Sequence, residues 1–390
     1  MSEKEVVFLI ANFPYTADIA DQQAWCFVQK KADRDFPWLF VSGYRVILSG
    51  LGKGWRGVRR KDRITSHAPW IGTGWILLDA VLAWIIHFID AIRASRQGRV
   101  IGIAPTPEAG LGIALARWLR KDKVYLVVRV QGHTASKALL VHRSRLRFMV
   151  LELIESFVLR QADLVAPMGK FTEELALKRG VKPDKVIGLP FPVRWASSAS
   201  LTPLPPEPCV LFVGRLEKEK GVHVLLEAMH QVRKAIPSVQ LLIAGDGSYR
   251  QELEKMTSHL NLRDHVSFLG WLEGADLQDK YRRAWVLVLP SIRAEGLGMV
   301  LVEAGLMGRP VIGSDLGGIR DIIRHGYNGF LVPPGNAKAL AEAILTVLMN
   351  RDLAHQMGLA NLEVAWRYLS QRDEALERVR RAILALVNEQ

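Results

Sequence analysis

The chain has 390 residues, of which 49% are hydrophobic and 23% charged, and its 52 Lys and Arg residues against 39 Asp and Glu give a formal charge of +13. These totals exclude a disordered, collagen-like or disulfide-stapled protein. The charge is unevenly spread, because residues 1–200 hold 30 basic and 17 acidic side chains whereas residues 201–390 hold 22 of each. Each half is long enough to bury its own core, so we expect a cationic domain and a neutral one.

The two cysteines, Cys26 and Cys209, lie far apart in the sequence. This excludes a disulfide framework and a cysteine-based zinc site, and we expect a reducing compartment. The first apolar run, 6–11, has only six residues. It is too short for the apolar core of a signal peptide and predicts a buried strand.

The apolar stretch at 70–92 approaches the length of a membrane span but contains Asp79 and Asp90. On a helix these carboxylates share one face, about three turns apart. Two carboxylates inside a bilayer are costly, so we expect a helix buried in a soluble domain, with a membrane span as the alternative.

Short apolar runs alternate with longer amphipathic ones, which is typical of an α/β fold with parallel sheets. The predicted strands of the first half are 6–11, 45–51, 100–104, 124–130, 164–167 and 186–189. Those of the second half are 210–214, 240–244, 266–269, 286–289, 310–313 and 329–332.

Residues 197–208 carry four prolines and no periodicity, which predicts a linker. The linker separates a domain at 1–196 from one at 209–372. After Asn336 the chain reads as helix almost to its end, with a last helical segment at 373–390.

The segment VLFVGRLEKEKG, from Val210, predicts a strand, a glycine turn and then a helix. It brings backbone N–H groups, Arg215 and Lys220 to the carboxyl end of a strand, where α/β sheets bind ligands. The pair suits a nucleotide diphosphate held without a metal. The alternative is a solvated charged turn, because Glu217 and Glu219 are interleaved with the two bases.

A second turn follows the strand at 240–244 and consists of Gly245, Asp246 and Gly247. Glycines there permit positive φ and close approach of a ligand to the backbone. Strand-to-helix turns often use Gly and Asp, so taken alone an ordinary turn is the favoured interpretation.

The most specific motif runs from Leu289 to Ile323 and contains Glu295, followed eight residues later by Glu303. We expect Glu295 at or just before a helix start and Glu303 about 12 Å further along the axis. One carboxylate then accepts hydrogen bonds from a donor sugar and the other from a ribose. The N–H groups of Gly296, Leu297 and Gly298 face phosphate or sugar.

The alternative for this motif is a helix-capping acid followed by an acid on a solvated helix face. The apolar neighbours Val302 and Ala304 disfavour it, because an unpaired acid is costly in such surroundings.

Together, the segments from Val210 to Gly335 resemble the C-terminal domain of family 4 glycosyltransferases, retaining enzymes of the GT-B fold with two facing Rossmann-like domains. The resemblance rests on Arg215 and Lys220, the Gly-Asp-Gly turn, the two glutamates and the run from Gly317, GGIRDIIRHGYNGFLVPPGN. It implies that Arg215 and Lys220 bind the donor diphosphate, Glu295 the donor sugar and Glu303 the ribose. It also implies that the last helix returns to the first domain.

The first half matches this family only in outline. The loop after the first strand, Asn12–Asp21, lacks the Gly-Gly pair by which family members close over the donor phosphates. The family's histidine at the reaction centre falls on Gln131, or on His133 if the loop is shifted by two residues. His133 then contacts the donor sugar or accepts a proton, as a catalytic residue alongside Glu295, and an ordinary loop histidine is the alternative.

The resemblance also implies same-face displacement, in which the leaving diphosphate helps to remove the acceptor proton. Arg215 and Lys220 stabilise that leaving group, the role that Mg²⁺ has in other transferases, so we expect no metal and no cofactor. The one Asp-x-Asp match, Asp33-Arg34-Asp35, does not follow an apolar strand and reads as solvated surface.

Basic clusters interleaved with Trp55 and Trp118 distinguish the first half and suit the headgroup region of an anionic membrane. We therefore expect a lipid-linked or polysaccharide acceptor and a cytoplasmic protein, peripheral at the inner face of the membrane. Nucleic acid competes for any basic surface, but no nucleic-acid motif accompanies these clusters. A generally basic proteome is the plainer explanation of the charge, and a non-catalytic GT-B scaffold or partner subunit is the alternative function.

Overall fold

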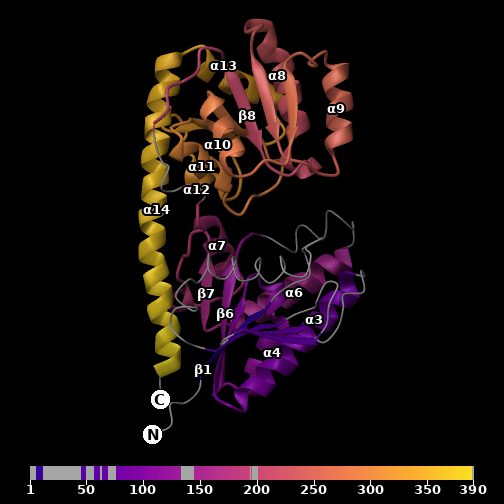
Figure 1. Cartoon of the computed structure of the whole chain (residues 1–390), viewed down its shortest axis with the longest axis vertical. Coiled ribbons are helices and arrows are strands. Elements are labelled where there is room, and N and C mark those ends of the chain that lie inside the picture. The colour runs from indigo at the N-terminus through magenta and orange to yellow at the C-terminus, as the bar shows by residue number, and fades with distance from the viewer. Residues whose placement is uncertain are drawn as a thin grey trace. The chain divides into compact units, whose positions relative to one another are not determined.

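The computed structural model describes residues 6–11, 45–49, 57–61, 64–68, 76–132, 145–193, 195 and 201–388. Its contacts divide the chain into two units (Figure 1). Unit 1 comprises residues 1–192 and 374–390, and unit 2 comprises residues 193–373.

Unit 1 is built on a sheet whose strands lie in the order β3-β4-β2-β1-β5-β6-β7. Its strands are β1 Val6–Ala11, β2 Arg45–Ser49, β3 Gly57–Lys61, β4 Ile64–Ala68, β5 Arg99–Ala104, β6 Val124–Val130 and β7 Leu164–Pro167. Its helices are α3 Ile76–Ser95, α4 Leu111–Leu119, α6 Arg145–Gln161 and α7 Lys170–Lys178, with 3-10 turns at Glu108–Gly110 and Pro183–Lys185.

Both faces of this sheet are buried, which explains why its central strands are almost entirely apolar. On one face, Val100, Val128 and neighbouring residues pack with side chains of α3, α4 and α6. On the other face, Ile101 and Val127 pack with the end of α14 Arg351–Asn388. Figure 1 shows the yellow α14 on the side of the sheet opposite α4. The expected return of the last helix to the first domain is confirmed, although the helix begins at Arg351 rather than 373.

The strands expected from the sequence differ from this sheet in two respects. Strands β3 and β4 were not predicted, and β3 pairs antiparallel with β4, so the sheet is not wholly parallel. The segment GVRRK of β3 lacks an apolar period, as edge strands often do. The predicted strand at 186–189 forms only an isolated bridge, Val165 with Val186.

The expectation of a buried helix near 70–92 is met by α3, in which Asp90 is only 5% exposed. Gly112 of α4 packs so closely on this helix that a Cβ there would lie 2.0 Å from the carbonyl oxygen of Trp84. Within the described ranges no helix is both long and apolar enough to cross a membrane.

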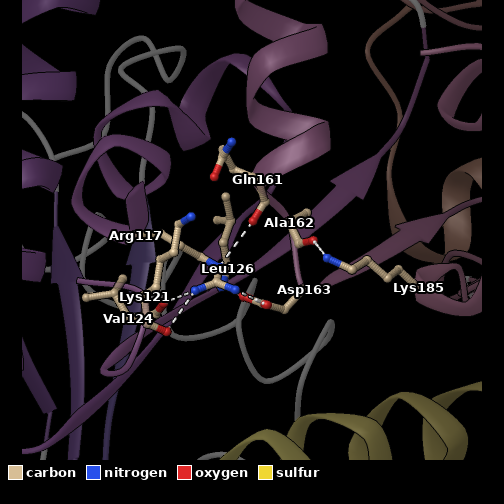
Figure 2. A network of polar contacts seen from close by, with 8 residues as sticks. All are labelled: Arg117, Lys121, Val124, Leu126, Gln161, Ala162, Asp163 and Lys185. Carbon is tan, nitrogen blue, oxygen red and sulfur yellow. Dashed lines mark hydrogen bonds and ion pairs between the residues drawn. The ribbon is translucent and has the colours of Figure 1, made fainter. Parts of the chain in front are cut away.

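Arg117, which precedes Trp118 in one of the basic clusters of the first half, forms a network of polar contacts within unit 1 (Figure 2). Its guanidinium pairs with Asp163 and donates to the carbonyl oxygens of Gln161 and Val124. The Asp163 carboxylate also accepts the N–H of Leu126, at 2.9 Å. This network joins α4, α6, β6 and β7, so Arg117 contributes to the stability of unit 1 rather than to a binding surface.

Unit 2 contains a parallel sheet in the order β10-β9-β8-β11-β12-β13. This is the strand order of a doubly wound dinucleotide-binding fold. From β8 the strands follow in sequence toward β10 on one side, and from β11 toward β13 on the other, so the strand order reverses between β8 and β11. The strands are β8 Cys209–Val213, β9 Gln240–Ala244, β10 Val266–Gly270, β11 Val286–Leu289, β12 Val311–Ser314 and β13 Gly329–Val332. The helices are α8 Val222–Ala235, α9 Arg250–His259, α10 Gly274–Arg283, α11 Met299–Leu306, α12 Ile319–Ile322 and α13 Ala337–Leu348, with a 3-10 turn at Lys218–Lys220.

The second half of the predicted linker is anchored to unit 2. The fully buried Arg309 donates to the hydroxyl of Thr202 and to the carbonyl oxygen of Pro203. Trp285 Nε1 donates to the carbonyl oxygen of Pro205 at 2.9 Å. Residues 202–205 are therefore part of the unit 2 packing, with the carbonyl oxygens of Pro203 and Pro205 satisfied by side-chain donors of the same unit.

Candidate functional site

Unit 2 brings several loops to the carboxyl ends of its strands, at the point where the strand order reverses. The loop after β8 and the loop after β11 are neighbours there, because β8 and β11 pair directly. Open α/β sheets bind ligands in this crevice. Two of the sequence-predicted residues, Lys220 and Glu295, come from these two loops.

Lys220 and Glu295 are in direct contact. The distance from Lys220 Nζ to Glu295 Oε1 is 2.6 Å, and each side chain is 17% exposed. The same oxygen accepts the hydroxyl of Ser291, the second residue after β11. Partial burial strengthens such charge-assisted bonds, so the carboxylate is held at a defined place at the sheet edge.

Glycines make this close approach possible. Gly221 has φ 70°, and a Cβ on it would lie 1.9 Å from the carbonyl oxygen of Pro290. Gly317 has φ 53°, and a Cβ on it would lie 2.6 Å from the carbonyl oxygen of Glu295. The Gly318 N–H then donates to that carbonyl at 2.9 Å, so the loop after β12 also supports Glu295. Only glycine combines these dihedral angles with these contacts.

Arg215 is placed differently from Lys220. Its side chain is 52% exposed and pairs with Glu217. This is the contact expected under the alternative interpretation of a solvated charged turn. Its second contact, with Glu219, is at 4.0 Å. The guanidinium thus stands in solvent beside the loop after β8, and its exposed pair is weak enough to exchange for an anionic ligand.

The Gly-Asp-Gly turn packs on the loop after β8. A Cβ on Gly245 would lie 1.9 Å from the carbonyl oxygen of Gly214. The Leu216 N–H donates to the carbonyl oxygen of Asp246 at 2.9 Å. The Asp246 carboxylate accepts the N–H of Gly247, so it caps its own turn. The contacts of this turn therefore support the neighbouring loop.

His223 follows the loop after β8, and Tyr249 follows the Gly-Asp-Gly turn after β9. Their rings pack edge to face at a centroid distance of 5.9 Å. Burial lowers the pKa of His223 below its usual 6.5, so its ring is neutral at neutral pH. The sequence analysis did not single out either residue. Each stands two positions after a turn glycine, Gly221 or Gly247, and this spacing was the signal that could have identified them.

Glu295 lies in the loop rather than at the helix start, because α11 begins four residues later at Met299. Gly298, with φ 81°, precedes that helix, and Leu297 is buried. Glu303 lies in α11 and is only 6% exposed, so it is not on a solvated helix face. Its partner is Tyr281 of α10, whose hydroxyl donates to Glu303 Oε2 at 2.7 Å.

Few of the residues that the sequence singles out in unit 1 are described. Gln131 is half-buried just after β6, whereas His133, the Asn12–Asp21 loop and Asp33-Arg34-Asp35 lie outside the described residues. Arg129, near the end of β6, is a buried cation that the sequence analysis missed. Its Nη2 donates to the carbonyl oxygen of Leu189 at 2.9 Å.

Ser291 and Tyr281 were also missed. Ser291 carried a usable signal, since it stands four residues before Glu295 in the same loop. Tyr281 carried none, because its contact with Glu303 joins two helices of different sequence segments. Across the described part of the chain, no group of three or more His, Cys, Asp or Glu residues is arranged to hold a metal ion.

Residues 193–363 match the family model described as glycosyl transferases group 1. The phosphatidyl-myo-inositol mannosyltransferase of Mycobacterium leprae is 40% identical over 160 residues, covering 41% of this chain and 42% of that protein. The alpha-D-kanosaminyltransferase of Streptomyces kanamyceticus is 34% identical over 178 residues, covering 45% of this chain and 46% of that protein. The matched region thus spans less than half of each of these curated relatives.

The crystal structure of the Anabaena protein HepE in complex with UDP has a TM-score of 0.71 to this chain. The two are 18% identical, and the match covers 96% of this chain and 99% of that one. At this identity the likeness concerns the fold alone, and it extends over both units.

Proposed function

Because residues 193–363 belong to the glycosyl transferases group 1 family and the chain has the GT-B fold, we propose that this protein transfers a hexose from a nucleoside-diphosphate sugar to a lipid-linked or polysaccharide acceptor. The observation that carries the proposal is the Lys220–Glu295 pair at the point where the unit 2 strand order reverses. A cation and a carboxylate side by side there suit a donor that is anionic at its diphosphate and rich in hydroxyls at its sugar.

The names of similar proteins support this donor and acceptor. One relative is named for mannosyl transfer to phosphatidyl-myo-inositol, and another for transfer of kanosamine. The structural neighbour HepE was solved with UDP. These names favour glycosyl transfer from a nucleotide donor to a lipid headgroup among the chemistries that this fold can host.

Each site residue has a role in the proposal. Arg215 and Lys220 hold the diphosphate oxygens, and the N–H groups of Gly296, Leu297 and Gly298 add neutral donors. Glu295 accepts hydrogen bonds from the donor sugar, and Glu303 accepts them from the ribose. The Gly245–Gly247 turn lines the nucleotide side.

Transfer then proceeds with retention of anomeric configuration. The bond between the anomeric carbon and the diphosphate oxygen breaks, and the acceptor oxygen forms its bond on the same face of the sugar. The acceptor proton passes to the departing diphosphate. Arg215 and Lys220 neutralise the charge that develops on this leaving group, so no metal ion is required. For His133 we propose the catalytic role that the family resemblance implies.

The proposed acceptor side lies on unit 1, where α6 carries a stripe of exposed apolar residues. Leu146, Met149, Val150 and Leu153 follow helical spacing and are 46% to 70% exposed. On α4, which contacts α6, Trp118 is 58% exposed and precedes the exposed Lys121. Apolar side chains beside cations suit the cytoplasmic, anionic leaflet of a membrane, where each cation contributes about 1 kcal/mol.

The donor chemistry is tested by measuring turnover of a panel of UDP-, GDP- and ADP-hexoses, with and without a chelator. We expect turnover of one donor, unaffected by the chelator, and a product with the donor's anomeric configuration by NMR. An inverted product or full loss with chelator contradicts the retaining, metal-independent mechanism. Nucleotide binding without turnover of any donor points instead to the non-catalytic scaffold.

The membrane surface is tested by flotation with vesicles of neutral or anionic phospholipid at low and high salt. We expect flotation with anionic vesicles that weakens with salt and is lost in Leu146→Ser combined with Leu153→Ser. Leu359→Ser on α14, also at an exposed leucine, is the matched control. Flotation that ignores lipid charge, or that survives the double substitution, contradicts this surface.

A further inference from the structure

The buried carboxylate of Glu303 accepts a hydrogen bond from a buried tyrosine. Tyr281 is fully buried in the last turn of α10, and its hydroxyl donates to Glu303 Oε2 at 2.7 Å. Burying a carboxylate is costly unless its oxygens receive hydrogen bonds. A tyrosine hydroxyl supplies such a bond without adding charge.

Tyr281 is itself fixed from two other directions. Arg309 Nε donates to the backbone oxygen of Tyr281 at 3.2 Å. The ring of Trp195 meets the Tyr281 ring edge on, with centroids 5.9 Å apart. These contacts restrict the backbone and the ring of Tyr281 in the position from which its hydroxyl reaches Glu303.

We propose that Tyr281 is a positioning residue for the nucleotide ribose: it holds Glu303 Oε2 and thereby sets the orientation in which the carboxylate receives the ribose hydroxyls. The inference rests on the proposed function, in which Glu303 binds the ribose. A carboxylate already held in its bound orientation loses less conformational freedom when the ribose arrives.

A phenylalanine at this position keeps the ring and loses only the hydroxyl. The Glu303 carboxylate then loses the hydrogen bond to Oε2 and is held less firmly in the orientation that receives the ribose. We expect Tyr281→Phe to weaken binding of a nucleoside diphosphate about tenfold, the effect of one hydrogen bond to a charged group. A 2′,3′-dideoxy nucleotide makes no hydroxyl contact with Glu303, so its binding should not change.

The experiment measures dissociation constants by calorimetry, first for UDP, GDP and ADP and then for the 2′,3′-dideoxy counterpart of the nucleotide that binds. The variants are Tyr281→Phe, Glu303→Gln and their combination. Tyr327→Phe is the matched control, because its hydroxyl donates to Glu363 at 2.6 Å in an exposed pair. The ratio of ribo to dideoxy dissociation constants is compared, since it does not depend on the fraction of folded protein.

The expected result is a ribo preference in the wild type that Tyr281→Phe reduces about tenfold and Tyr327→Phe leaves intact. Tyr281→Phe should add no further loss in the Glu303→Gln background. An unchanged ratio, or equal weakening of both nucleotides, overturns the positioning role.

Two further outcomes separate this inference from the proposed function. A wild type that binds ribo and dideoxy nucleotides equally overturns the ribose role of Glu303, and the Tyr281 inference with it, but leaves sugar transfer standing. A wild type that binds none of the three diphosphates and turns over no donor overturns both.

Discussion

Lys220 and Glu295 stand 75 positions apart in the sequence, yet the Nζ of one lies 2.6 Å from Oε1 of the other. The pair exists because β8 and β11 are adjacent and parallel, so the loops that follow them leave the sheet at the same edge. In the proposed function, the donor sugar meets the carboxylate and its diphosphate meets the ammonium. The pair would then couple recognition of the sugar to stabilisation of the leaving group.

The first prediction concerns Glu295→Gln. The amide keeps the shape of the side chain but removes the charge that faces Lys220 and the donor sugar. We expect kcat to fall about 100-fold or more, and KM for the donor to change much less, since the charge matters most in the transition state. Steady-state kinetics with the donor found in the panel measure both constants.

Glu252→Gln is the control for this substitution, because Glu252 pairs with Lys255 at 2.9 Å on the exposed face of α9. Its kinetics should equal those of the wild type. A Glu295→Gln enzyme with unchanged kcat would show that the carboxylate has no part in transfer.

The second prediction compares alanine at two glycines with positive φ. Gly326 has φ 78°, and no described atom lies within 4 Å of the place that a Cβ would take, so Gly326→Ala should cost only the dihedral strain, about 1–2 kcal/mol. Gly221 has φ 70°, and a Cβ there would lie 1.9 Å from the Pro290 carbonyl oxygen. Gly221→Ala should therefore cost about 1–3 kcal/mol more.

Urea unfolding of the two variants measures this difference. The Gly221 variant should also lose donor binding, because the displaced loop carries Lys220. Equal losses of unfolding free energy in the two variants would show that the loop after β8 can move away from the loop after β11 without a loss of stability.

The third prediction concerns the anchored part of the linker. Burial lowers the pKa of the Arg309 guanidinium to about 10. The guanidinium donates hydrogen bonds to the Thr202 hydroxyl and to the carbonyl oxygens of Pro203 and Tyr281. Arg309→Met leaves the buried Tyr281 carbonyl oxygen without this donor, at about 1–3 kcal/mol, and removes the part-buried bonds to Thr202 and Pro203. We expect a clear loss of stability in unit 2 and faster proteolysis within residues 201–208.

Arg320→Met is the comparison, since Arg320 pairs with Asp315 in solvent and is 58% exposed. Its unfolding free energy should change by less than about 1 kcal/mol. If Arg309→Met left the cleavage rate at 201–208 unchanged, the anchoring of this segment would not depend on the guanidinium.

The fourth prediction is a pH dependence in unit 1. Burial raises the pKa of the Asp163 carboxyl above its usual 3.8, outweighing the Leu126 N–H bond and the Arg117 charge. The folded state therefore binds the proton more tightly than the unfolded state. The stability contributed in this way is fully present below pH 3.8 and is lost as the pH rises through the folded pKa.

Asp163→Asn removes this titration. The unfolding free energy of the wild type minus that of the variant should increase as the pH is lowered toward about 4. Chemical denaturation at a series of pH values measures the difference. A difference that decreases on acidification would mean that the Arg117 pair, rather than burial, dominates the pKa of Asp163.

The local signals in this chain were sufficient for most of the fold. Apolar runs predicted β1, β6, β7, β9 and β11 at their observed bounds, because a strand buried on both faces needs apolar residues throughout. Strands β3 and β4 escaped prediction; β3 lies at the edge of the sheet, where a strand has no such requirement, and β4 is its neighbour. The apolar run at 186–189 was predicted as a strand but is not one. It is half-buried, and it pairs with β7 only through the isolated bridge between Val165 and Val186.

By itself the sequence determined the two-domain α/β architecture, the glycine turns and the list of charged residues that follow the strands of unit 2. These depend on side-chain periodicity and on backbone conformations that only glycine adopts readily. Tertiary structure alone decided which of those residues meet: Lys220 with Glu295, Tyr281 with Glu303, Arg309 with the linker, and Arg117 with Asp163. Each of these contacts joins segments brought together by strand order and helix packing, which no local pattern encodes.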